Sequence, residues 1–497
     1  MDYRMLRRGA IVPIALFALL MGCESGLPRD VAIGGSSTCI YDEGGSDTLI
    51  VGSTLLRPNS AMQNGGLVVL PSGKIGDIAA FTELVVAYPE ASRLDCRGTT
   101  VLSPGWINVH EHEAFSYVFP DPSLSPIYRH REEWIFGRND MPALPIPADQ
   151  SYDSEDATSL AVLTWVELRH LVAGTTTLGG PGAMPGLAKN VGHHTNSYDA
   201  AAYTFEADLE IFPFSLEAIT RFADVCEDHA GTEATLAKRP LRNLAYAPHV
   251  GEGRKTDCTA VSEMDAFVAH VEQNQGSGRR YSAVHAVAAQ PRHLIKFGKL
   301  DVTLVWSPRS NVNLYGETID LQESKRHGVR LALATDWSPS GSFNMLEEFD
   351  CARAVAEQQN SEFDARQLWS MATINAAYAV GIENAVGQLR PGLQADLILV
   401  RKHDSQQPYA AAVNASVDDI LSIWVDGVPI VANAQIAERL KPGSECVALG
   451  ARDKVICADF TALQNSWDDI VVVTREMVPM NGDTSGQSPC PISGTTE

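Results

Sequence analysis

The chain contains the stretch VLSPGWINVHEH at residues 101–112, in which an apolar run is followed by two histidines. The run from Val101 to Val109 is typical of a buried strand. Side chains two positions apart on a strand point to the same face, so His110 and His112 can meet one metal ion. We therefore expect a strand that carries two metal-binding imidazoles at its end.

Other polar residues follow other strand candidates along the chain. His249 and Glu252 come after the apolar run at residues 243–248, His285 ends the run at 281–284, and Asp336 ends the run at 329–335. The interval from His249 to His285 fits one strand and one helix, and the next interval leaves room for a further strand at residues 302–306. Catalytic groups of a (β/α)8 barrel collect at the carboxyl ends of its strands, so these residues are expected to share one site.

The patterning divides the chain into a small sheet, a large α/β body and a second small sheet. Short β-rich runs occupy residues 47–100 and return in 386–440, whereas residues 101–385 alternate strand-like and helical runs. Such alternation is typical of a parallel sheet with crossover helices, which makes the fold class α/β. Residues 114–153 are predicted to be an ordered excursion over one mouth of the body, and residues 441–497 a C-terminal extension and tail.

Residues 1–22 have the organisation of an export signal. Three arginines precede an uncharged stretch from Gly9 to Gly22, which is too short to span a bilayer. The sequence then reads Leu20-Met21-Gly22-Cys23, which resembles the bacterial lipoprotein signal, in which the cysteine is lipidated and becomes the new N-terminus. An ordinary secretory signal with an incidental Cys23 is the alternative, and either one exports the protein.

We expect a lipid on Cys23 to anchor the protein to the bacterial cell envelope, at the outer membrane or the periplasmic face in a Gram-negative cell. Residues 23–46 are rich in Gly and Ser and are predicted to be a flexible tether. This lipid is the expected membrane contact. The oligomeric state is left open, a homo-oligomer included.

The charge and the cysteine content limit which partners and which cellular compartment are expected. The 497 residues include 38 Lys and Arg against 61 Asp and Glu, a net charge of -23, so no nucleic-acid partner is expected. Eight of the nine cysteines remain after Cys23, an even number that permits disulfides in an oxidising compartment. Cys446 and Cys457 bracket a candidate hairpin, and the spacing leaves the other pairings open. No CxxC pair supports a thiolate zinc site.

The sequence resembles the amidohydrolase superfamily of metal-dependent hydrolases, in the branch of ring deaminases, triazine chlorohydrolases and imidazolonepropionase-related enzymes. The matching stretches follow the family's order and cover about residues 48 to 435. They are residues 103–112, 174–177, 249–253, 307–316, 335–341 and 387–397. The resemblance implies a (β/α)8 TIM-type barrel with a small β-sandwich domain formed by the N- and C-terminal segments.

The resemblance also implies the site. It gives one divalent metal ion four ligands, His110, His112, His249 and Asp336. It gives His285 the role of orienting the attacking water or the substrate oxygen and Glu252 that of a proton shuttle. A metal bound in this way lowers the pKa of a bound water to about 7. Asp336 can accept a proton from that water, and Glu252 can protonate a ring nitrogen or leaving group.

Several positions around these residues complete the expected site. Arg309 and Trp337 lie beside it in the resemblance and are candidate substrate contacts. Asn108 stands where many relatives carry Asp, at a position next to the ligands. No Lys ends a plausible fourth strand, since Lys189 and Lys238 lie in polar segments flanked by Gly or Pro. One metal per chain is the consequence, with zinc favoured and iron or manganese left open.

The expected function is hydrolysis of a carbon–nitrogen bond in a small molecule, either deamination of an aminated heterocycle or opening of a cyclic amide. One alternative is a hydrolase of linear, peptide-like amides, whose family members often carry the bridging Lys. Another is a non-catalytic envelope lipoprotein that binds a metal or ligand on the same fold.

Overall fold

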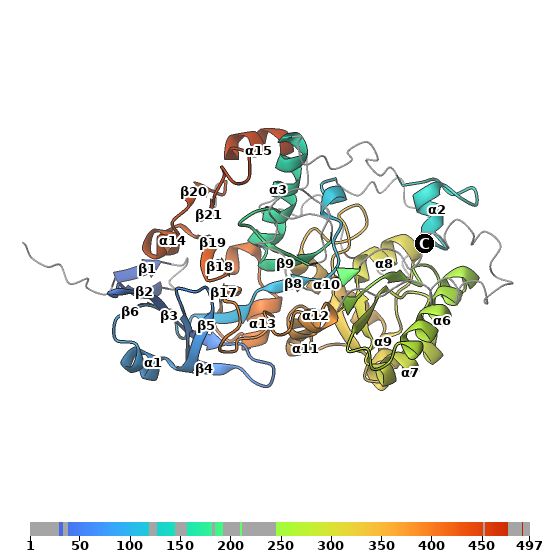
Figure 1. The fold of residues 1–497 in the computed structure, drawn as a ribbon, viewed down its shortest axis with the longest axis horizontal. Coiled ribbons are helices and arrows are strands. Elements are labelled where there is room, and N and C mark those ends of the chain that lie inside the picture. The colour runs from blue at the N-terminus through green and yellow to red at the C-terminus, as the bar shows by residue number, and fades with distance from the viewer. Residues whose placement is uncertain are drawn as a thin grey trace, which may run out of the picture.

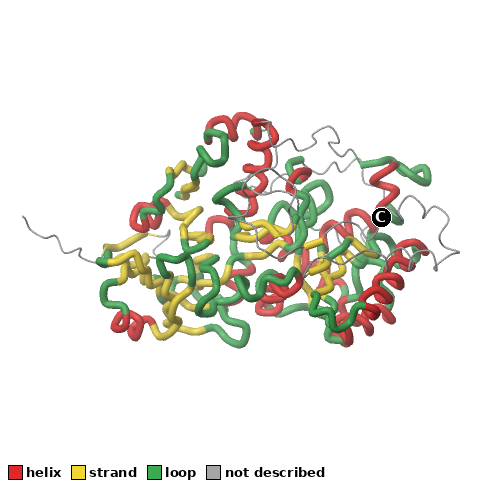
Figure 2. Tube along the Cα trace, viewed as in Figure 1, coloured by secondary structure: helices red, strands yellow, loops and turns green. Residues whose placement is uncertain are grey.

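The computed structural model describes residues 29–32, 38–118, 127–144, 157–180, 184–191, 209–210, 245–450, 453–475 and 490. The predicted export signal and Cys23 lie outside these ranges. Within them, no helix combines the length and the apolar character that a membrane crossing requires. A large sheet lies at one end of the molecule, and parallel strands with flanking helices lie toward the other (Figures 1 and 2).

The large sheet has twelve strands and joins both ends of the described chain. Its order is β1-β2-β6-β3-β7-β17-β18-β19-β21-β20, with β4 beside β3 and β5 beside β4. The strands are β1 Arg29–Ala32, β2 Thr38–Asp42, β3 Ser46–Leu55, β4 Met62–Val69, β5 Ile75–Ala80, β6 Ala91–Asp95, β7 Thr100–Pro104, β17 Leu397–Arg401, β18 Ile420–Val425, β19 Val428–Asn433, β20 Glu445–Ala448 and β21 Lys454–Ala458. The antiparallel pairing of β7 with β17 brings the N-terminal and C-terminal parts together.

This sheet differs from the sequence expectation in three places. Strands β1 and β2 lie in the stretch predicted to be a tether, where Val31 and Cys39 are fully buried. Strands β20 and β21 lie in the stretch predicted to be an extension. Residues 84–86 lie in the region where short β-rich runs predicted a sheet, residues 47–100, and instead belong to helix α1, Phe81–Ala87. Phe81 and Leu84 face the core at helical spacing, whereas Val86 is 80% exposed.

The second part of the fold consists of parallel strands. One sheet has the order β10-β9-β8, and another has the order β11-β12-β14-β15-β16, with β13 beside β14. Every pairing in both sheets is parallel. The strands are β8 Trp106–Asn108, β9 Thr175–Gly179, β10 Lys189–Val191, β11 Leu209–Glu210, β12 Ala245–Tyr246, β13 His249–Val250, β14 Arg280–His285, β15 Thr303–Trp306 and β16 Arg330–Leu333.

Helices connect and cover these strands, as expected for parallel connections. Helix α3 ends shortly before Gly174, and α2 lies inside the predicted excursion. The helices after α1 are α2 Arg131–Phe136, α3 Ala157–Val172, α6 Cys258–Gln273, α7 Pro291–Leu300, α8 Pro308–Tyr315, α9 Leu321–Arg326, α10 Met345–Gln358, α11 Ala365–Met371, α12 Ile374–Ala379, α13 Pro408–Val413, α14 Ala434–Leu440 and α15 Trp467–Thr474.

The chain passes from the large sheet to the parallel strands at Gly105. This residue separates β7 from β8, and its backbone N–H donates to the carbonyl of Asp396 at 3.0 Å. A Cβ atom at Gly105 would lie 2.2 Å from the hydroxyl of Thr176, so a side chain does not fit there. The run at residues 101–109 is therefore two strands that belong to different sheets.

Local sequence explains where several helices begin and end. The Asp257 side chain accepts a hydrogen bond from the Ala260 backbone and begins α6, and Asn344 begins α10 in the same manner. Helix α8 begins with Pro308, directly after β15, and ends at Gly316, whose φ is 69°. The side chains of α8 therefore start at the carboxyl end of that strand.

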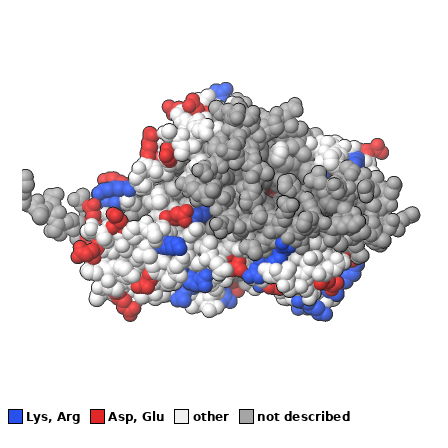
Figure 3. Space-filling view, viewed as in Figure 1, with Lys and Arg blue, Asp and Glu red and all other residues white. Residues whose placement is uncertain are grey.

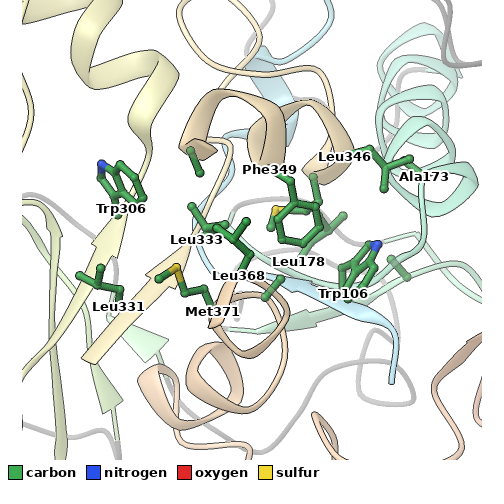
Figure 4. Close-up of a cluster of buried hydrophobic side chains, with 14 of the residues drawn as sticks. Trp106, Ala173, Leu178, Trp306, Leu331, Leu333, Leu346, Phe349, Leu368 and Met371 are labelled. Atoms are coloured by element: carbon green, nitrogen blue, oxygen red, sulfur yellow. The ribbon is translucent and has the colours of Figure 1, made fainter. Parts of the chain in front are cut away.

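The core between the parallel strands and the helices is apolar and closely packed. Trp106 of β8 packs edge-on against Phe349 of α10, with 5.3 Å between the ring centroids. Leu178 of β9, Leu333 of β16 and Met371 of α11 lie in the same cluster (Figure 4). The cluster therefore ties strands of both parallel sheets to helices on one side.

Disulfides connect distant parts of the chain. Cys39 pairs with Cys96, and Cys351 pairs with Cys490. Cys446 pairs with Cys457 across the antiparallel hairpin of β20 and β21, which confirms the predicted hairpin. Cys258 is also disulfide-bonded. Sequence spacing had left all pairings other than Cys446 with Cys457 open.

Charged side chains of both signs are interspersed on the described surface in Figure 3. Exposed pairs such as Arg292 with Asp265, 2.9 Å apart, bring opposite charges together. Such exposed pairs contribute little to stability because water screens them. The apolar core and the disulfides therefore contribute more to stability than these exposed pairs.

Candidate metal centre

The residues expected at the site come from four neighbouring strand ends. His110 follows β8, His249 begins β13, His285 ends β14, and Asp336 follows β16. Glu252 lies in the turn after β13. His110, His285 and Asp336 thus lie at or after the carboxyl ends of their strands, whereas His249 lies at the amino end of the short strand β13.

One group of metal-compatible atoms joins His110, His112 and Asp336. Nε2 of His110 lies 3.1 Å from Oδ1 of Asp336, and Nε2 of His112 lies 3.4 Å from the same oxygen. The ligand atoms of the three residues lie within 4.8 Å of one another. His110 and Asp336 are buried, whereas the His112 side chain is 28% exposed.

A second group joins His110, His249 and His285, again within 4.8 Å. Nε2 of His249 lies 3.3 Å from Nε2 of His112, which connects the two groups. The ring centroids of His110 and His249 are 4.4 Å apart. Four imidazoles and one carboxylate therefore converge on one place.

Asn311 of α8 orients the ring of His285. The Asn311 side-chain nitrogen donates to the hydroxyl of Thr318 at 3.0 Å, so its Oδ1 is turned toward His285. Nδ1 of His285 lies 3.0 Å from this oxygen and donates to it. Nε2 of His285 is consequently the nitrogen left to accept a proton or face a ligand.

The electrostatics of the cluster favour neutral imidazoles at His110 and His249. Burial acts to lower the pKa of His112, but Asp336 outweighs it and raises that pKa. Burial lowers the pKa of His110 to about 4, and burial with the neighbouring imidazoles lowers the pKa of His249 well below its ordinary value. Burial acts to raise the pKa of Asp336, but the charge of His285 and hydrogen bonds from His110 and His112 outweigh it and hold that pKa well below its usual range. Neutral imidazole and ionised carboxylate are the forms that bind metal.

The donor set fits a divalent transition metal. Nε2 of His112 and Nε2 of His249 lie 3.3 Å apart, a separation at which the two nitrogens share either a proton or a cation. Imidazole nitrogen and carboxylate oxygen are the ligands that zinc, iron and manganese share. The site residues therefore suit the kind of metal that the sequence predicts.

Ser310 and a strained backbone hold Asp336 in place. The Ser310 hydroxyl donates to Oδ2 of Asp336 at 2.5 Å, which leaves Oδ1 toward the histidines. Asp336 has a φ of 69°, and its backbone N–H donates to the His110 carbonyl at 3.0 Å. Positive φ values at residues other than glycine cluster at functional sites.

Behind the ligands lies a buried network that sequence analysis missed. Glu111 accepts hydrogen bonds from Ser116 and Thr335, and its Oε2 lies 3.2 Å from Nε2 of His170. Asn108 donates to Glu111 at 3.2 Å and to Thr335 at 2.6 Å. Burial acts to raise the pKa of Glu111, but the charge and hydrogen bond of His170 lower it to about 2. His170 had no motif around it, so the sequence offered no signal for this partnership.

Glu252 is 2% exposed and has two polar neighbours on one oxygen. The hydroxyl of Tyr315 donates to Oε1 at 2.7 Å, and Nε2 of His285 lies 4.0 Å from the same atom. The predicted excursion also contacts this turn, since the backbone N–H of Arg131 donates to the Glu252 carbonyl at 3.2 Å. Tyr315 lies in the family-like stretch at residues 307–316, but nothing in the sequence gave it a role.

The two candidate substrate contacts have different surroundings. Nε of Arg309 donates to the Ser342 hydroxyl at 2.9 Å, away from the histidines, and the side chain is buried. Trp337 lies closer to the cluster, with its ring 6.0 Å from that of His112, and its indole N–H donates to Ser340 at 2.5 Å. Trp337 therefore borders the site more directly than Arg309.

Lys189 is held by carboxylates at the junction with the large sheet. Its Nζ lies 2.8 Å from Asp396 and 2.7 Å from Asp426, and it donates to Gln394 at 2.5 Å. These contacts bind the amine of Lys189 to residues of the C-terminal segment, which are distant in sequence from the expected metal ligands. Lys238 lies outside the described residues.

Comparisons with known proteins agree with this arrangement. Residues 269–430 match the model of the amidohydrolase family. The 5-methylthioadenosine/S-adenosylhomocysteine deaminase of Thermodesulfovibrio yellowstonii is 23% identical over 423 residues, which cover 77% of this chain and 92% of that protein. The imidazolonepropionase of Desulfotalea psychrophila is 24% identical over 419 residues, 75% of this chain and 95% of that protein.

Solved structures show the same fold. Guanine deaminase from Bradyrhizobium japonicum superposes with a TM-score of 0.53 at 15% identity, covering 77% of this chain and 99% of its own. An adenosine deaminase from Xanthomonas campestris with bound zinc gives 0.51 at 18% identity, covering 80% and 97%. These likenesses imply a TIM-barrel fold with mixed α/β content, the class expected from the sequence. The comparisons support the amidohydrolase superfamily, and the chain is accordingly a hydrolase of carbon–nitrogen bonds other than peptide bonds.

Proposed function

We propose that this chain uses one divalent metal ion, zinc in the first instance, to hydrolyse a carbon–nitrogen bond in a heterocyclic small molecule. The observation that carries the proposal is the convergence of four imidazoles and the Asp336 carboxylate at neighbouring strand ends. We also infer that the parallel strands close into a (β/α)8 barrel and that the large sheet is the sandwich built from both chain ends.

The proposed ligands are His110, His112, His249 and Asp336. When bound, the metal would lower the pKa of a water molecule so that hydroxide, the attacking nucleophile, is available at neutral pH. Asp336 would accept the proton of that water, and the Ser310 hydroxyl holds its carboxylate through Oδ2. His285, held through Nδ1 by Asn311, presents Nε2 to orient the attacking water or the substrate oxygen. Glu252 delivers a proton to the ring nitrogen or leaving group.

Deamination of an aminated ring is the favoured reaction, and opening of a cyclic amide is the second. The relatives are named as a 5-methylthioadenosine/S-adenosylhomocysteine deaminase and an imidazolonepropionase, which represent these two reactions. Trp337 lies beside His112 and is a candidate contact for a planar ring. Both reactions place an sp2 carbon bearing nitrogen at the metal.

The first test measures metal content and turnover together. The chain from residue 24 onward keeps β1 and the disulfides and is purified without chelator or affinity histidines. We expect about one transition metal per chain by mass spectrometry and ammonia release from one of 5-methylthioadenosine, S-adenosylhomocysteine, adenosine and guanine. Two metals per chain would instead favour the peptide-like amides, and no metal after zinc reconstitution would contradict the proposal.

Two variants separate chemistry from metal binding. Glu252→Gln removes the proton donor and is expected to abolish turnover while metal content stays at the wild-type value. His249→Ala is expected to lose the metal and turnover together. Unchanged activity in Glu252→Gln would remove Glu252 from the mechanism, and full metal occupancy in His249→Ala would remove it from the ligand set.

We propose further that the protein is exported and anchored by a lipid on Cys23. The disulfides at Cys39–Cys96, Cys351–Cys490 and Cys446–Cys457 support an oxidising compartment. Metabolic labelling with radioactive palmitate tests the anchor. Label is expected on the wild type and absent from Cys23→Ser, and an unlabelled wild-type chain would contradict it.

A further inference from the structure

The carboxylate of Glu252 is reached by a chain of two hydrogen bonds from helix α2. The indole N–H of Trp134 lies 2.8 Å from the hydroxyl oxygen of Tyr315, and that hydroxyl lies 2.7 Å from Oε1 of Glu252. An indole nitrogen can only donate, so the Tyr315 oxygen accepts from Trp134. The single proton of Tyr315 therefore points to Glu252.

The inner hydrogen bond of this relay is buried. Tyr315 is 1% exposed and Glu252 2% exposed, so the bond between them competes little with water, whereas Trp134 is half-buried. Burial and the charge of Glu252 raise the pKa of Tyr315 well above its ordinary value. The hydroxyl consequently remains a donor throughout the neutral and mildly alkaline range.

Helix α2 is fixed to the same turn by separate contacts. Nη1 of Arg131 donates to Oε2 of Glu263 at 3.0 Å, and the Gly251 backbone N–H donates to that same oxygen at 3.0 Å. The Arg254 backbone N–H donates to the carbonyl of Arg129 at 2.7 Å. The residues on both sides of Glu252 are thus tied to the segment that carries Trp134.

Trp134 also contacts the opposite side of the site. Its ring centroid lies 5.3 Å from that of Trp337, the residue after Asp336. Helix α2 therefore touches the turn that holds Glu252 and the turn that holds Asp336. A displacement of α2 would alter both turns.

We propose that Tyr315 and Trp134 are positioning residues for Glu252, and that α2 aligns this carboxylate for proton delivery. The inference rests on the proposed role of Glu252. Fixing Oε1, the oxygen 4.0 Å from Nε2 of His285, sets the plane of the carboxylate relative to the histidine cluster. A carboxylate free to rotate would spend part of its time in unproductive orientations, which lowers the rate of proton transfer.

The kinetic test removes one hydrogen-bonding atom at a time. Tyr315→Phe deletes the hydroxyl and is expected to lower kcat about tenfold or more, with KM and metal content within about twofold of the wild type. Trp134→Phe deletes the indole N–H and is expected to lower kcat by a smaller factor. The double variant is expected to match Tyr315→Phe alone, because Trp134 acts through Tyr315.

Tyr88→Phe is the matched control. It removes a tyrosine hydroxyl that donates to the Asp77 carboxylate, also at 2.7 Å, on the large sheet. Wild-type kcat is expected in this variant. The inference is overturned if Tyr315→Phe keeps wild-type kcat, or if the two single losses multiply in the double variant.

Hydrogen exchange tests the relay even if none of the amines is turned over. Mass spectrometry follows the amides of residues 251–254 in the wild type, in Tyr315→Phe and in Trp134→Ala. Faster exchange at Gly253 and Arg254 in both variants supports the positioning role, and wild-type exchange in both contradicts it. A metal-loaded wild type that turns over none of the amines would contradict the proposed reaction. The exchange result would still show whether Trp134 and Tyr315 hold the turn that carries Glu252.

Discussion

At the scale of single residues, the proposed metal site depends on the charge of Glu111, which is not one of the proposed ligands. Glu111 stands between His110 and His112, and its side chain is bonded on the far side to Thr335 and His170. A fully buried carboxylate is costly unless it has charged or polar partners. The network therefore holds the backbone that presents both histidines.

Replacing His170 is expected to destabilise the fold because Glu111 loses its imidazole partner. His170→Leu should lower the free energy of unfolding by about 3 kcal/mol, measured by urea denaturation. The control His327→Leu breaks a pair with Glu323 of the same 3.2 Å separation at a half-exposed helix end. That loss is expected to stay below about 1 kcal/mol, and equal losses in the two variants would contradict the account.

A second buried acid, Glu348 of α10, is expected to make stability depend on pH. Burial raises the pKa of Glu348 to about 8, against the opposing effect of its hydrogen bonds with Ser342 and Arg309. The folded chain keeps this proton where the unfolded chain has lost it. The contribution of Glu348 is therefore complete below about pH 4.5 and is lost as the pH rises toward about 8.

The variant Glu348→Gln imitates the protonated side chain. Urea unfolding between about pH 5 and pH 8 should show a smaller loss of stability in Glu348→Gln than in the wild type. Glu357→Gln, an exposed position on the same helix, should keep the wild-type dependence. A parallel pH dependence in all three proteins would exclude Glu348 as a source.

At the scale of elements, alternation of strands and helices could be read from the sequence, but local exceptions could not. Residues 84–86 have strong strand propensity, yet α1 forms there because Phe81 and Leu84 bury one helical face. Residues 29–32 and 38–42 were predicted to belong to a tether, but they form strands. They gain stability from the pairing of β2 with β6 and from the disulfide to Cys96, and both partners are distant in the sequence. Strand and helix propensities reflect the local sequence, so they do not reveal such distant partners.

The disulfide of this N-terminal hairpin is expected to matter more than that of the C-terminal one. Cys39 and Cys96 are 57 residues apart, whereas Cys446 and Cys457 are 11 apart. The entropy of loop closure predicts stabilisation of about 4 against about 3 kcal/mol. The buried positions of Cys39 and Cys96 add to the difference.

Double alanine variants, one for each disulfide, measure this difference in stabilisation. Thermal unfolding without reductant should give a lower Tm for Cys39→Ala with Cys96→Ala than for Cys446→Ala with Cys457→Ala. The reverse order would show that β1 and β2 contribute little to the sheet.

At the scale of the whole molecule, spacing placed the principal site residues at strand ends because histidines and carboxylates stand directly after apolar runs. What spacing could not supply was the support around them. Tyr315, Ser310 and His170 come from helices whose contacts with the site depend on three-dimensional packing. The expected ligands could thus be named from the sequence, whereas the residues that hold them required the structure.

The proposed metal would also add a link between the two parallel sheets, which already meet through backbone hydrogen bonds between residues 110–112 and Asp336. His110 and His112 follow β8 in one parallel sheet, whereas His249 begins β13 and Asp336 follows β16 in the other. An ion that binds only the folded chain adds about 4 kcal/mol when present at a thousand times its Kd. Removing it with EDTA is therefore expected to lower the Tm, and adding zinc to restore it.

The variant His249→Ala tests whether this stabilisation arises at the proposed site. Its Tm is expected to be the same with EDTA and with zinc, because the ion has lost a ligand. The control His403→Ala alters a histidine that is 55% exposed and paired with Asp419, and it should keep the full response to zinc. A response that persists in His249→Ala would place the stabilising ion elsewhere in the molecule.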